Sequence, residues 1–140
     1  MDRLDIQIPV PSLAYDELAA PPQSEGSDAV RQRVNVARAR QQARLDSAHS
    51  GIHSNAQMGP RQIQKHCKVA AAGQALLKAA VDRLGLSARG FDRLLKVART
   101  IADLDAAEGI MSRHLAEAIQ YRSLDRTEIT AQAEPAGRAV

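Results

Sequence analysis

The chain has 140 residues, a formal net charge of +3 and no tryptophan, and 44% of its residues are apolar. Of these, 26 are alanines, whereas aromatic residues make up only 2% of the chain. Alanine favours helices, and strands prefer β-branched and aromatic side chains, so this composition excludes a β-sandwich or barrel and predicts a small all-α domain. Since no apolar run approaches the roughly 20 residues that span a bilayer, and no signal peptide is evident, we expect a cytoplasmic protein without membrane contact.

The first 26 residues are predicted to be an extended segment that precedes the helices. Apolar side chains alternate with others between residues 6 and 13, and Pro9 and Pro11 interrupt the pattern. The alternation indicates an edge strand or an extended connector, because proline cannot donate a hydrogen bond to a neighbouring strand. The proline-rich polar stretch 21–26 then predicts a linker.

Helical periodicity and capping residues predict a bundle of four to five helices. The first helix has about 18 residues and begins at Ser27 or Asp28, and a polar loop over 47–59 follows it. Gly85 and Ser87 are a C-terminal and an N-terminal helix cap, respectively. The later helices are expected over residues 60–66, 69–84, 88–104 and 113–122.

The same periodicity predicts which side chains face the core, and it ends before the C-terminus. From about Thr127 the sequence lacks periodicity, which predicts a disordered tail over 127–140. The expected inward faces are Val30, Val34, Ala37 and Leu45; Val69, Ala72, Leu76, Ala80 and Leu84; Phe91, Leu94, Leu95, Ala98, Ile101 and Ala102; and Leu115 and Ile119.

Few residues indicate catalysis or metal binding. The phosphate-binding loop GxxxxGK[ST] and the motifs GxGxxG, HExxH and GxSxG are all absent. His49 and His53 are four residues apart, but their loop of Gly, Ser and Asn favours solvated histidines over a metal site. Cys67 is interpreted as a small, half-buried apolar residue rather than a nucleophile. We therefore expect no metal site and no enzymatic activity from this chain on its own.

Arginines supply the remaining candidate site residues. Arg89 follows the capping Ser87 and lies about 160° around the helix from Phe91, away from the apolar face. A cation at the start of a helix opposes the helix dipole, so helix stability does not favour an arginine there. Arg89 either contacts an anion such as a phosphate or is simply solvated.

Two further groups of arginines have simpler alternatives. Between residues 31 and 44 lie five arginines and no acidic residue. Arg31, Arg38 and Arg40 are candidates for nucleic-acid contact, although arginine stems lying over an apolar helix face also explain them. Arg3 stands between Asp2 and Asp5, where a local ion pair is the simpler explanation.

Several stretches together resemble one family. Residues 87–104, which begin Ser87-Ala88-Arg89-Gly90-Phe91, and residues 114–122 resemble the C-terminal domain of magnesium chelatase. Asp2-Arg3-Leu4-Asp5 resembles the segment that ends the ATPase core of the ComM (YifB) group, the magnesium-chelatase-like AAA+ ATPases of bacteria. The chain departs from that group at Lys68 and Met1, where leucines are common. Further similarity to the group lies in Val30-Arg31-Gln32-Arg33-Val34, Ala37-Arg38, Gln41, Asn55-Ala56 and Cys67.

The resemblance implies a helical bundle of the AAA+ lid type. Residues 1–26 would connect it to an ATPase core, residues 27–126 would form the lid, and residues 127–140 would be the tail. Arg89 would be the sensor-2 residue that contacts nucleotide phosphates, and Arg3 an arginine finger toward a neighbouring subunit.

The resemblance also implies cofactors and partners. The full-length protein would be a hexamer that binds ATP and Mg²⁺, and this fragment alone would bind neither. The partners of the fragment would be its own ATPase core and the neighbouring subunits. The ATPase would drive DNA branch migration in natural transformation, or Mg²⁺ insertion into a porphyrin. A free-standing basic helical module that binds nucleic acid or protein is the alternative function.

Overall fold

The computed structural model describes residues 5–22, 24–45 and 51–131, with side chains described up to residue 122. Within these ranges the fold is all-α, as the composition predicts, and contains no β-strand. None of the described helices is long and apolar enough to cross a membrane. In chain order the elements are α1 (Tyr15–Ala19), α2 (Ser27–Leu45), the short 3-10 helix η1 (Asn55–Gln57), α3 (Pro60–His66), α4 (Ala71–Leu84), α5 (Ala88–Leu104) and α6 (Ser112–Ala131).

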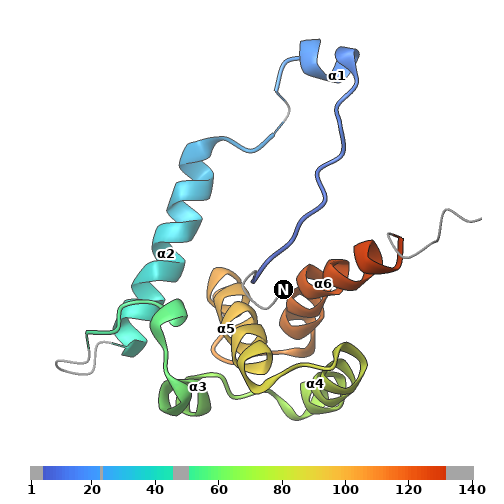
Figure 1. The fold of residues 1–140 in the computed structure, drawn as a ribbon. Coiled ribbons are helices and arrows are strands. Elements are labelled where there is room, and N and C mark those ends of the chain that lie inside the picture. Colours follow the sequence, from blue (N-terminus) through green and yellow to red (C-terminus); the bar gives the residue numbers. More distant parts are fainter. Residues whose placement is uncertain (1–4, 23, 46–50, 132–140) are drawn as a thin grey trace, which may run out of the picture.

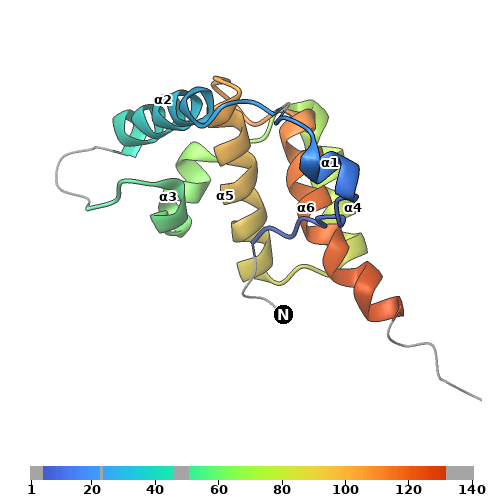
Figure 2. The ribbon, with the colours of Figure 1, turned by 90° about the horizontal axis from the view of Figure 1, so that it is seen from above.

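Helix α5 lies at the centre of the fold. Helices α2 and α3 pack against one side of it and α6 against the other, and α4 packs on α6 (Figures 1 and 2). The apolar face of α5 explains this position, because Leu94, Ala98 and Ala102 are completely buried. Leu115 and Ile110 are equally buried where α6 and the segment before it close the core.

Local sequence signals predict several helix ends correctly. Pro60 is the first residue of α3, and Gly85 ends α4 in the left-handed conformation, with φ of 57°. The Ser87 hydroxyl accepts a hydrogen bond from the backbone N–H of Gly90 and so caps α5. These three predictions are confirmed.

Two of the predicted inward faces are partly wrong. In α2, Ala37 and Leu45 are buried, but Val30 and Val34 are exposed because the first half of the helix extends beyond α5 (Figure 1). In α4, Ala80 is buried as predicted. Ala72, however, is exposed, and the neighbouring Gly73 and Leu77 are buried instead.

The two ends of the described chain also differ from the prediction. Residues 6–13 form no strand with any described residue, so of the two predicted alternatives the structure has the extended connector (Figure 1). Helix α6 continues to Ala131, past the predicted end at 122 and into the stretch predicted to be disordered from Thr127. No glycine or proline occurs between residues 112 and 131 to end the helix. The rest of the predicted tail, 132–140, lies outside the described residues.

Candidate functional site

The first turn of α5 holds the candidate phosphate-contacting residue. The hydroxyl of Ser87 lies 3.1 Å from the backbone nitrogen of Gly90, and this hydrogen bond fixes the turn that carries Arg89. Arg89 is exposed on this turn, as its position around the helix predicts. Its guanidinium makes no hydrogen bond or ion pair with any residue in the described ranges. The side chain is therefore available to an anion.

Arg89 borders an open groove between α3 and α5. Met58, Pro60 and Ile63 form one wall, and Arg89, Asp92, Arg93 and Lys96 form the other. Three cations against one carboxylate give this groove a positive charge. Lys96 donates a hydrogen bond to the carbonyl of Ala56 at 2.9 Å, and Arg93 pairs with Asp5 at 3.3 Å.

A buried polar network lies at the other end of α5 and centres on Asp103. Its carboxylate accepts hydrogen bonds from Arg44 at 2.6 and 2.7 Å, from Arg99 at 3.0 Å and from Asn55 at 2.8 Å. Asp103, Arg99 and Asn55 are all at least 98% buried. Burial by itself would raise the pKa of Asp103, but the hydrogen bonds from Arg44 and Asn55 and the charge of Arg99 outweigh it and lower that pKa.

The network connects three elements of the fold. Arg44 belongs to α2, Asn55 to η1, and Asp103 to α5. Arg99 also donates to the carbonyls of Ala107 and Glu108, beyond the end of α5. Sequence reasoning missed these residues, although Arg99 and Asp103 are four residues apart on the buried side of a helix, a spacing at which side chains meet.

Two of the three candidate arginines of α2 contact groups of the chain itself. Arg31 pairs with Asp28 at 3.1 Å, and Arg40 donates to the carbonyl of Ala106 at 3.0 Å. Arg38 is exposed and makes no such contact with any residue that the structure describes. Helix α2 contacts Asp103 at the end of α5 and Ala106 just beyond it, whereas Arg89 lies at the beginning of α5. The structure therefore does not bring these arginines together with Arg89.

The structure describes two of the remaining sequence candidates, Cys67 and His53. Cys67 is buried, and burial raises the pKa of its thiol to about 11, which suits an apolar role better than a nucleophile. His53 is exposed, while His49 and Arg3 lie outside the described residues. In the described part of the chain, no three His, Cys, Asp or Glu side chains gather as metal ligands.

Comparisons with known proteins agree on one similarity. Residues 24–122, which include Arg89 and the Asp103 network, match the model of the family "Magnesium chelatase, subunit ChlI C-terminal". The chain is 39% identical over 134 residues to YifB of Escherichia coli K12, an alignment that covers 94% of this chain and 25% of YifB. It is 37% identical over 127 residues to the competence protein ComM of Haemophilus influenzae, covering 90% of this chain and 24% of ComM.

A third relative shows a similar sequence identity and a similar coverage of both chains. YifB of Salmonella typhimurium is 38% identical over 129 residues, which cover 92% of this chain and 24% of that protein. The chain thus spans about a quarter of the length of the curated relatives it matches.

Proposed function

This chain belongs to the magnesium chelatase subunit ChlI C-terminal family, and we propose that it is the helical lid of a ComM-type AAA+ ATPase. In this role it closes over ATP bound by an ATPase core and contributes a phosphate-contacting arginine. The chain alone is not an enzyme, since ATP and Mg²⁺ bind the full-length protein through the core. The core and neighbouring subunits, in a hexamer, are its partners.

The observation that carries this proposal is the position of Arg89 and the absence of a described partner for its side chain. It stands on a capped first turn, beside a positively charged groove, with no described side chain engaging its guanidinium. A guanidinium is permanently charged and its planar fork matches phosphate oxygens, so a phosphate group fits this position. Bound ATP would supply the phosphoryl group, and Arg89 would bind its negative charge as a sensor-2 residue.

Arg3 has a separate part in the proposal. By its resemblance to the DRxD segment, Arg3 serves as an arginine finger toward the ATP of a neighbouring subunit. An arginine that reaches the transferred phosphoryl group neutralises charge that develops there, which is the basis for this assignment. Its support is the sequence resemblance, because Arg3 lies outside the described residues.

For the process that the ATPase drives, we favour DNA branch migration in natural transformation over insertion of Mg²⁺ into a porphyrin. The support is the 37% identity to a protein named for competence. Both processes use the same lid chemistry, so the role of Arg89 does not depend on this choice.

The experiment replaces the matching region of Escherichia coli YifB with this chain and measures ATP turnover by the chimaera. Arg89→Ala should lower turnover about 10- to 100-fold, which corresponds to the loss of one charge-assisted hydrogen bond. Arg38→Ala is the matched control, because Arg38 is also an exposed arginine without a described partner, and turnover should not change.

A measurement on the 140-residue chain separates function from stability. Arg89→Ala should leave its urea unfolding curve unchanged, since the exposed side chain makes no hydrogen bond or ion pair with a described residue. Unfolding by this substitution would show that Arg89 is structural. ATP hydrolysis at enzymatic rates by the 140-residue chain alone would contradict the lid proposal.

The alternative, a free-standing nucleic-acid-binding module, has less support. Arg31 and Arg40 are held by the chain itself, which leaves Arg38 as the one of the three candidates without a described partner. A titration with DNA at several salt concentrations tests it. Micromolar binding with a steep salt dependence, abolished when all three arginines are replaced, would establish the alternative.

A further inference from the structure

We infer that Arg93 is a second phosphate-binding residue of the groove beside Arg89, and that Asp5 competes with the phosphate for it. Asp5 pairs with the Arg93 guanidinium in this chain, and the phosphates of ATP would displace it. The inference rests on the proposed function, since it assumes that ATP phosphates reach Arg89. It goes further in naming another residue that binds them and a group of the chain itself that opposes their binding.

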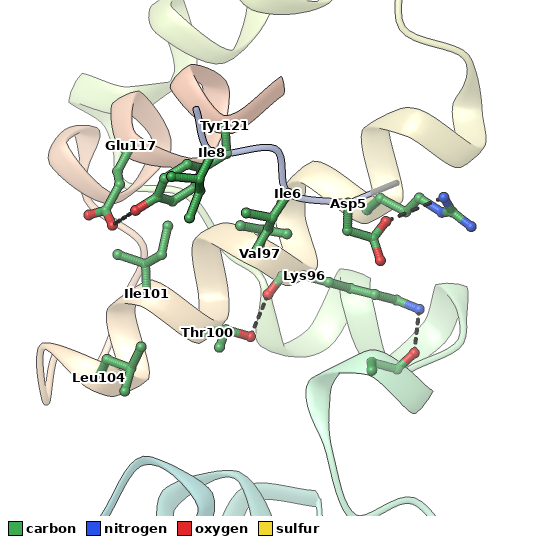
Figure 3. A pocket seen from close by; sticks show the side chains of 12 residues that line it. Asp5, Ile6, Ile8, Lys96, Val97, Thr100, Ile101, Leu104, Glu117 and Tyr121 are labelled. Atoms are coloured by element: carbon green, nitrogen blue, oxygen red, sulfur yellow. Dashed lines mark hydrogen bonds and ion pairs between the residues drawn. The ribbon is translucent and has the colours of Figure 1, made fainter. Parts of the chain in front are cut away.

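Arg93 lies where two depressions of the surface meet. On one side it lines the groove between α3 and α5 together with Arg89. On the other side it lines a hollow of about 460 Å³ between α5, α6 and residues 5–8. Figure 3 shows Asp5 at one end of this hollow, with its ion pair to Arg93 as a dashed line. A single guanidinium therefore borders both the groove and the carboxylate.

The spacing of the two arginines suits a shared phosphate chain. Arg89 and Arg93 are four residues apart on α5, a spacing that places them on one face of the helix with their Cβ atoms about 6 Å apart. A guanidinium is a planar fork that can donate two parallel hydrogen bonds to phosphate oxygens. Two such side chains, one helical turn apart, can hold one phosphate chain between them.

The ion pair between Arg93 and Asp5 is suited to exchange. Its nitrogen and oxygen atoms are 3.3 Å apart, and 25% of the Arg93 side chain and 55% of the Asp5 side chain are exposed. An exposed pair of this kind contributes little stability, because water screens the charges and both side chains lose freedom. A triphosphate carries several negative charges against the one charge of Asp5, so it attracts the guanidinium more strongly. Arg93 can therefore exchange one anion for another.

The other charged side chains of the groove are less suited to this role. Lys96 donates a hydrogen bond to the carbonyl of Ala56 at 2.9 Å, and this contact holds η1 against α5. Phosphate binding by Lys96 would break that contact between two elements of the fold. Asp92 is an anion and repels phosphates. Arg93 is therefore the better companion for Arg89.

Two substitutions with opposite effects test the inference. Each would be made in the chimaera with Escherichia coli YifB described above, and the Kd of ATP would be measured by titration in the presence of Mg²⁺. Arg93→Ala should raise this Kd about 10-fold, because the phosphates lose one charged hydrogen-bonding partner. Asp5→Asn should lower it about 2- to 5-fold, because the competing carboxylate is gone. An unchanged or higher Kd in Asp5→Asn would show that the pair is only structural and would overturn the inference.

A double variant and a control pair show whether Asp5 acts through Arg93. Asp5→Asn should no longer improve ATP binding once Arg93 is replaced by alanine. Tighter binding in that background would mean that the charge of Asp5 repels ATP directly, which would overturn the competition. The control is another exposed ion pair, Arg33 with Glu25 at 2.9 Å, and Arg33→Ala and Glu25→Gln should both leave the Kd unchanged. Equal changes in the control pair would also contradict the inference.

A measurement on the 140-residue chain does not depend on an ATPase core. Inorganic tripolyphosphate would be added while NMR follows the side-chain Nε–H signals of Arg89 and Arg93. Both signals should shift with the same midpoint concentration, and Asp5→Asn should lower that midpoint about 2- to 5-fold. An Arg93 signal that does not shift, with or without a shift of Arg89, would overturn its role. The backbone spectrum of each variant reports whether it still folds.

The inference and the proposed function fail separately in these experiments. Turnover that depends on Arg89, with a Kd that responds to neither Arg93→Ala nor Asp5→Asn, would retain the sensor-2 assignment and refute the second phosphate-binding residue. Turnover that is insensitive to Arg89→Ala would refute the sensor-2 assignment. In that case the tripolyphosphate titration would still decide whether Asp5 competes with phosphate for Arg93.

Discussion

Asp103 is one carboxylate shared between two arginines in a part of the fold that water hardly reaches. Arg99 is 98% buried, and Arg44 approaches the same carboxylate with two hydrogen bonds. A buried ion pair is weak support for stability as a whole, because desolvation offsets its attraction. Removing the Asp103 carboxylate, in contrast, should cost much stability, since it leaves the Arg99 guanidinium buried without a counter-charge.

We therefore expect Asp103→Asn to lower the free energy of unfolding by about 3–5 kcal/mol, measured by urea denaturation. The matched control is Asp28→Asn, which breaks the exposed ion pair with Arg31 and should change the same quantity by less than about 1 kcal/mol. Equal, small losses for both variants would show that the network does not stabilise the fold.

At the scale of single elements, helix α4 is constrained by its contact with α6. Gly73 is buried where the two helices meet. A Cβ atom at this position would lie 2.8 Å from Val69 Cγ1 and 2.9 Å from Leu115 Cδ1, closer than such atoms approach without displacement. The small residue therefore allows α4 to pack closely on α6.

Gly73→Ala should destabilise the protein, although helix propensity alone would make the alanine variant more stable. Alanine normally stabilises a helix by about 1 kcal/mol relative to glycine. Here overpacking should dominate and lower the free energy of unfolding by about 1–3 kcal/mol, seen as a lower melting temperature. Gly109→Ala, where nothing lies within 4 Å of the added Cβ, should leave the melting temperature nearly unchanged. A more stable Gly73→Ala variant would show that α4 moves freely away from α6.

Elements with local signals are the ones that the sequence predicts well. Pro60, Gly85 and Ser87 each act on their own backbone or on the next few residues, so helix ends follow from short stretches. Periodicity shows which side chains share a face, but not how far a neighbouring helix extends to cover them. For that reason Val30 and Val34 were predicted to be inward and are exposed.

In the candidate site, too, features set by nearby residues could be predicted and features set by distant residues could not. The exposure of Arg89 follows from its angular position on one helix, and its proposed role from the family resemblance. The network around Asp103 could not be assembled from the sequence, because Arg44 and Asp103 are 59 residues apart. Only the packing of α2 across α5 brings them together, and no pattern within either helix indicates that packing.

At the scale of the whole molecule, the chain consists of a packed helical body and an N-terminal segment, residues 5–22, that contributes little to it. All described residues from 5 to 22 except Gln7 are exposed, whereas the core is built from residues 45 to 118 together with Ala37. This segment contacts the body through the Gln7 hydrogen bond and the ion pair of Asp5 with Arg93. The side chains of Ile6 and Ile8 also line a hollow between α5 and α6 (Figure 3). The apolar side chains of this segment therefore bury little surface in this chain.

Deleting residues 1–22 should change the free energy of unfolding by less than about 1 kcal/mol, because exposed ion pairs and single hydrogen bonds contribute no more than this. Urea denaturation of the truncated chain measures the change. Leu115→Ala is the contrasting variant, since truncation of this fully buried side chain should lower the same quantity by about 2–5 kcal/mol. A truncated chain as unstable as Leu115→Ala would show that this segment belongs to the body's own core. If truncation leaves stability intact, the large apolar side chains of the segment do not stabilise the fold of this chain. These side chains are Ile6, Ile8, Val10, Leu13, Tyr15 and Leu18.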